Sequence, residues 1–87
     1  MEKEYLIAFS SFYKAAYARD LLEEEGFAVS LAKLPAELLR SCGTGVLLRT
    51  DDPAAAERFL QEQQITTRGI YEAAGLRRFE PVKKTLI

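Results

Sequence analysis

Apolar residues occur in short runs along this chain, and the spacing within each run predicts a different kind of element. Tyr5–Phe9 is almost wholly apolar, which is typical of a strand with both faces covered. From Phe12 to Glu25 apolar side chains recur every three or four residues, after two serines and before Gly26, and this pattern predicts a capped helix. Residues 27–32 alternate large and small side chains, which predicts a second strand. The helix stripe comprises Phe12, Ala15, Ala18 and Leu22, and the strand face comprises Phe27, Val29 and Leu31.

The second half of the chain repeats this arrangement. Gly45–Arg49 is again an apolar run, and Asp51-Asp52-Pro53 is a start signal for a helix reaching about Gln63. Residues 65–71 predict a fourth strand, weakened by Gly69 and its polar neighbours. A shift of 38 positions also places Leu22 on Leu60 and Phe27 on Ile65, as two related β-α-β halves would require.

The order strand, helix, strand, strand, helix, strand predicts an α+β fold of the ferredoxin-like βαββαβ type. In this arrangement two helices cover one face of a four-stranded antiparallel sheet. We expect a single domain over residues 1–72, followed by an extension over 73–87 that forms an edge strand, a dimer arm or a tail. The sheet face without helices makes a homodimer a reasonable hypothesis.

The composition of the chain disfavours several classes of partner and of cellular location. The 87 residues carry 12 Lys plus Arg and 13 Asp plus Glu, a net charge of −1, which disfavours nucleic acid and anionic membranes as partners. The charged amino terminus leads directly into a strand and does not have the pattern of a signal peptide, and no apolar stretch has the length of a membrane span. One cysteine excludes an internal disulfide, so we expect a cytoplasmic, reducing environment.

Cys42 is the only thiol, and its setting is polar and rich in glycine. Gly43 and Gly45 allow positive φ and close approach of amide groups to an anion, which would lower the thiol pKa below about 8.5. The same glycines are equally consistent with a tight turn into the third strand. Cys42 itself is either a working thiol or a half-buried cysteine tolerated in a turn.

Histidine is absent from the chain. Cys42 therefore has no imidazole base, and a zinc site would have only one thiolate and carboxylates for ligands. These features disfavour enzymatic turnover, a metal site and any other cofactor.

Several of these segments together resemble the small bacterial family of putative selenium/sulfur carrier protein-like domains, over roughly Tyr5 to Tyr71. The family has a proline, usually followed by arginine, and a serine-rich turn that ends in Cys-Gly. Here Ala36 stands in the place of that arginine, and Arg40 can supply a charge from a different position. The matching segments are Tyr5–Phe9, Pro35-x-Glu37-Leu38-x-x-Ser41-Cys42-Gly43, Val46–Arg49 and Gly69–Tyr71.

The resemblance implies that Cys42 accepts sulfur or selenium from a donor protein and passes it to an acceptor protein. Pro35 would shape the loop, and the residues that condition the thiol would be Arg40, Ser41, Gly43, Thr44 and Gly45. Two other hypotheses remain open at this point. One is an interaction or ligand-sensing module that uses the open sheet face or an edge strand. The other is a redox-regulated homodimer bridged through Cys42.

Overall fold

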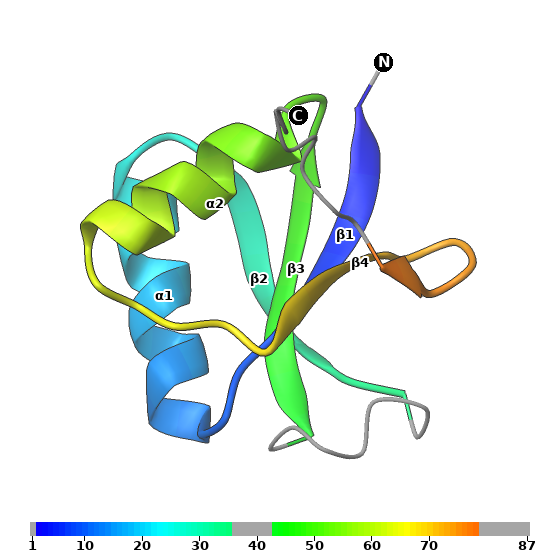
Figure 1. Cartoon of the computed structure of the whole chain (residues 1–87), viewed down its shortest axis with the longest axis horizontal. Coiled ribbons are helices and arrows are strands. Elements are labelled where there is room, and N and C mark those ends of the chain that lie inside the picture. Colours follow the sequence, from blue (N-terminus) through cyan, green and yellow to red (C-terminus); the bar gives the residue numbers. More distant parts are fainter. Residues whose placement is uncertain (1, 36–42, 79–87) are drawn as a thin grey trace, which may run out of the picture.

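The computed structural model of the chain describes residues 2–35 and 43–78, and it shows an antiparallel sheet with two helices on one side (Figure 1). Strands and helices follow one another in the order that the hydrophobic pattern predicts. Their bounds are β1 Lys3–Ala8, α1 Phe12–Glu24, β2 Ala28–Lys33, β3 Thr44–Thr50, α2 Pro53–Glu62, β4 Gly69–Glu72 and β5 Arg77–Arg78.

The strands lie in the order β2-β3-β1-β4-β5, and every neighbouring pair is antiparallel. β1 lies near the middle because its apolar run Tyr5–Ala8 can be buried on both faces. The first four strands have the ferredoxin-like order, so the predicted α+β fold is confirmed. β5 adds a two-residue edge strand beside β4.

Side chains between the helices and the sheet form the main core. From α1, Ala15, Ala18 and Leu22 are fully buried, and Ala56 and Leu60 of α2 are also fully buried. The alanines are small, which lets each helix backbone approach the sheet closely, and each buried leucine stabilises the fold by about 2 kcal/mol. On the strands, the main-core residues include Tyr5, Ile7, Val46, Leu48 and Ile70, and the predicted β2 face of Phe27, Val29 and Leu31 packs against them.

The sequence indicates the caps at the start of both helices and at the end of α1, and the structure confirms them. The hydroxyl of Ser11 accepts a hydrogen bond from the amide of Lys14 at 3.1 Å, and the Asp52 carboxylate accepts one from the amide of Ala55 at 3.3 Å. At the end of α1, Gly26 has φ +101°, the left-handed conformation predicted for it. These caps satisfy backbone groups that have no partner within the helix.

One predicted strand boundary is wrong. The fourth strand was expected from Ile65, but β4 begins at Gly69. The amide of Ile65 instead donates to the carbonyl of Leu60 at 2.9 Å, and Gln64 between them has φ +61°. Ile65 is therefore the apolar residue that closes the end of α2, and its buried side chain belongs to the core without belonging to a strand.

The sheet face opposite the helices carries a second, smaller cluster. Leu6 and Ala8 of β1 and Leu34 are its buried members. Partly buried Ala32, Leu47, Tyr71, Ala73 and Leu76 pack against them. Alternation along β1 produces this cluster, because successive side chains of a strand point to opposite faces.

The division at residue 72 stays a prediction. The turn after β4 leads into β5, which pairs with β4 through Tyr71 and Glu72. Residues 73–78 thus continue the sheet in the described part of the extension, whereas 79–87 lie outside the described residues.

Candidate functional site

The predicted cysteine site lies between β2 and β3, and the structure describes both ends of this connection. Lys33 and Thr44 form the last strand pair, and beyond it the amide of Leu34 donates to the carbonyl of Gly43 at 2.9 Å. Pro35 follows this hydrogen bond and is partly buried. Cys42 and the two residues before it, Arg40 and Ser41, lie outside the described residues.

Gly43, directly after Cys42, has φ +87°. A Cβ atom at this position would meet no atom within 4 Å, so space does not require glycine here. The backbone conformation requires it, because residues with a side chain rarely adopt this φ. A glycine therefore sets the direction in which the chain passes from the cysteine into β3.

Gly45 has a different role two residues later. It lies inside β3, where it pairs with Ala8 of β1 and Ala32 of β2. A Cβ atom at this position would collide with the carbonyl oxygen of Ile7 and lie 2.8 Å from Cδ2 of Leu34. Close packing at the end of the sheet therefore explains why position 45 is a glycine. The role of Gly45 in conditioning Cys42 stays a prediction.

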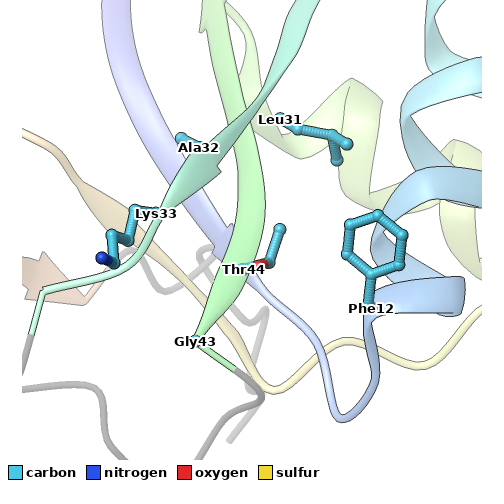
Figure 2. Close-up of a pocket in the computed structure, with 6 residues that line it drawn as sticks. All are labelled: Phe12, Leu31, Ala32, Lys33, Gly43 and Thr44. Atoms are coloured by element: carbon cyan, nitrogen blue, oxygen red, sulfur yellow. The ribbon is translucent and has the colours of Figure 1, made fainter.

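A pocket of about 520 Å³ adjoins this end of the hairpin. Leu31 of β2, Thr44 of β3 and Phe12 of α1 point toward one another across it, and the Lys33 side chain points away (Figure 2). The remaining lining residues are Ala32 and Gly43. The pocket therefore has an apolar wall formed by Phe12 and Leu31, a hydroxyl group from Thr44, and the residue next to Cys42 at its edge.

Phe12 is a site residue that the sequence pattern placed incorrectly. It was expected on the buried stripe of α1, but its side chain is 51% exposed. Phe12 is the first helical residue after the Ser11 cap, where a side chain points back past the end of the helix and away from the core. That position after the cap is the signal that could have indicated exposure.

The aromatic side chains that follow are exposed as well. Tyr13 is 83% exposed and Tyr17 is 56% exposed, so neither packs in the core as an aromatic side chain usually does. The rings of Phe12 and Tyr13 meet edge to face, with centroids 6.1 Å apart. Phe12 therefore lies beside the pocket together with a second exposed ring.

Among the described residues that line the pocket, Lys33 is the only charged one. At the opposite end of β3, Arg49 donates to the carboxylate of Glu4 at 2.8 Å, and this hydrogen bond raises the pKa of the guanidinium. Within residues 2–35 and 43–78, no group of His, Cys, Asp and Glu side chains is arranged to hold a metal ion. The described helices include none with the length and hydropathy of a membrane span.

Comparison with models of protein families gives a match over most of the chain. The model of the family described as Putative Se/S carrier protein-like matches residues 4–72, which run from the second residue of β1 to the end of β4 and include Cys42. Neither the curated proteins nor the solved structures contain a significant match to this chain.

Proposed function

The chain belongs to the Putative Se/S carrier protein-like family, and on this premise we propose that Cys42 carries a sulfur or selenium atom between two proteins. The observation that carries the proposal is the match over residues 4–72, because that range includes the chain's only thiol. The donor and the acceptor would be proteins that handle sulfur or selenium. Their identities and the cytoplasmic location stay predictions.

The transfer needs no external oxidant. The Cys42 thiolate attacks the outer sulfur of a persulfide on the donor, R–S–SH, and forms Cys42–S–SH while the donor leaves as the thiolate R–S⁻. An acceptor thiolate then attacks the same outer sulfur and releases Cys42 as a thiolate. Each step forms one S–S bond and breaks another, so the sulfane sulfur moves without net oxidation. Selenium would follow the same route as a selenenylsulfide.

The pocket supports this chemistry by its position and its lining. A transfer step requires the partner's sulfur to reach Cys42, and the pocket borders Gly43, the residue bonded to that cysteine. Phe12 and Leu31 present apolar surface, which suits a polarisable sulfur atom and its side chain. Thr44 adds one hydroxyl group at the pocket wall.

Intact mass spectrometry tests the proposal directly. The reduced chain is incubated with a small-molecule persulfide, and we expect one adduct, heavier by about 32 Da for a sulfur atom. Addition of a thiol acceptor should remove the adduct and yield the acceptor persulfide. Cys42→Ser is the matched control and should gain no mass. An unchanged wild-type mass, or the same gain in Cys42→Ser, would contradict the proposal.

We further expect Arg40 to favour the thiolate form of Cys42, since a nearby positive charge stabilises an anion. Arg40→Gln should then slow adduct formation at pH 7 by roughly threefold to tenfold, with a smaller difference at high pH, where the thiol is ionised in both proteins. Lys33→Gln is the matched control, because it removes a charge whose side chain points away from the pocket. Equal rates of adduct formation in Arg40→Gln and wild type would show that Arg40 does not influence the Cys42 thiol.

An interaction module with a structural cysteine would behave differently in the same experiments. Alkylation of Cys42 would then leave partner binding unchanged, and the persulfide would give no transferable adduct. A positive transfer result together with loss of transfer on alkylation distinguishes the carrier from that alternative.

A further inference from the structure

The two outer edges of the described sheet are built differently. β5 forms one edge, and its described part consists of Arg77 and Arg78. β2 forms the other edge and has six residues, which are uncharged from Ala28 to Ala32. Proteins usually protect sheet edges with short strands, charges, proline or bulges. The described part of β5 carries charge at both of its positions, whereas β2 has a single lysine at its end.

The backbone of β2 has a defined outward side. Leu34 donates to Gly43 across the β2–β3 pair, so positions 28, 30, 32 and 34 direct their amides and carbonyls toward β3, because antiparallel ladders alternate. Val29, Leu31 and Lys33 therefore direct theirs outward. In the described residues no hydrogen bond is recorded for these three outward amides. They form a row of groups that another strand can pair with.

Space and exposed apolar surface lie along the same edge. The pocket lined by Phe12 adjoins Leu31 to Lys33, and a second pocket of about 190 Å³ adjoins Ala28 to Ser30. Phe12 projects from α1, the helix that packs on β2, and half of its surface is exposed. Aromatic side chains of this kind are enriched in the buried centres of protein interfaces.

We propose that β2 pairs with β2 of a second copy of this chain, antiparallel and about a two-fold axis at Leu31, so that the two sheets join into one. This register uses every outward amide and carbonyl of the strand. It places Lys33 opposite Val29 of the partner subunit, so like charges do not face each other. The self-complementary register is the reason to favour a second copy over a different protein.

The arrangement also brings the two α1 helices together. α1 packs over β2 and β3, so a continuous sheet makes α1 and its copy neighbours on the same face, with opposite directions. The exposed ring of Phe12 then lies at the border between the two copies. Leu34 and Gly43, the described residues on either side of the Cys42 segment, lie at one end of β2, so their copies lie at the opposite end of the joined strands. The dimer contact at Leu31 is therefore independent of the proposed transfer chemistry.

Sedimentation equilibrium of the full chain in reducing buffer, from micromolar to millimolar concentration, tests the association. We expect a reversible rise from the monomer mass of 9.8 kDa to twice that value, in wild type and in Cys42→Ser alike. A monomer mass at every concentration would overturn the proposal. This holds even if β2 were then found to bind a segment of another protein.

A proline substitution and hydrogen exchange locate the interface. Lys33→Pro removes an outward amide without removing a bond to β3, and it should weaken dimerisation about tenfold or more, since one hydrogen bond is lost in each copy. Lys33→Ala keeps the amide and should dimerise like wild type. In wild-type protein, the amides of Val29, Leu31 and Lys33 should gain protection as concentration rises, while the inward amide of Ala32 stays unchanged. A dimer without this pattern of protection would show that the interface lies elsewhere, and would refute the proposal even if Lys33→Pro failed to fold.

Discussion

The two β-α-β halves of this protein follow the same local plan but reach different positions in the sheet. In both halves a polar side chain caps the start of the helix, and a leucine near its end is fully buried. Both helices also end with the same backbone hydrogen bond: the amide of Phe27 donates to Leu22 at 3.0 Å, and the amide of Ile65 donates to Leu60 at 2.9 Å. The 38-residue shift in the sequence corresponds to this shared helix end.

The halves differ after that hydrogen bond. Phe27 leads directly into β2, which becomes an edge of the sheet. Ile65 is followed by three further residues before β4, which lies between β1 and β5. Equivalent helix ends therefore lead to one strand with an open edge and one strand with neighbours on both sides. The comparison shows that local capping determines where a helix stops, whereas sheet order determines what the next strand can do.

The largest expected effect concerns the two buried leucines. Leu22→Ala and Leu60→Ala should each lower the free energy of unfolding by about 3 kcal/mol, because each leaves a cavity in the main core. Urea denaturation followed by circular dichroism measures both losses. If the halves are energetically equivalent, the two values agree within about 1 kcal/mol. A much smaller loss in one half would show that its helix contributes less to the core than its burial suggests.

Substitutions at the ends of the two helices should change the free energy of unfolding by smaller amounts, and the two changes should have opposite signs. Gly26→Ala should destabilise the protein by about 1 kcal/mol, because φ is +101° at this position. Gln64→Gly should instead stabilise it by about 0.5 kcal/mol, since Gln64 holds φ +61° with a side chain that disfavours it. The same denaturation measurement checks both. A loss of stability in Gln64→Gly would mean that the glutamine side chain makes a compensating contribution.

Much of the fold could be predicted because its signals are local. The cap residues Ser11 and Asp52, the apolar period of α1 and Gly26 all act within a few residues of the element that they define. The start of β4 could not be predicted in the same way. Ile65 is apolar in either role, and only its hydrogen bond to Leu60 shows that it closes a helix.

The candidate site was predicted less completely. The sequence indicated the turn at Gly43, which has the expected positive φ. It did not indicate the pocket, because Phe12, Leu31 and Thr44 come from three separate elements and meet only at the end of the sheet. The reason for a glycine at position 45 also became clear only in the structure, because the atoms that exclude a side chain there belong to Ile7 and Leu34.

The sequence by itself determined the kinds of element, their order and the position of the single thiol, because caps, periodicity and composition can be read from the chain without its tertiary contacts. The tertiary structure decided which strand became an open edge, which face of α1 left Phe12 exposed, and which residues surround the end of the hairpin. Those outcomes depend on contacts between segments far apart in the chain, and the local pattern of one segment does not specify which side chains of another segment it will meet.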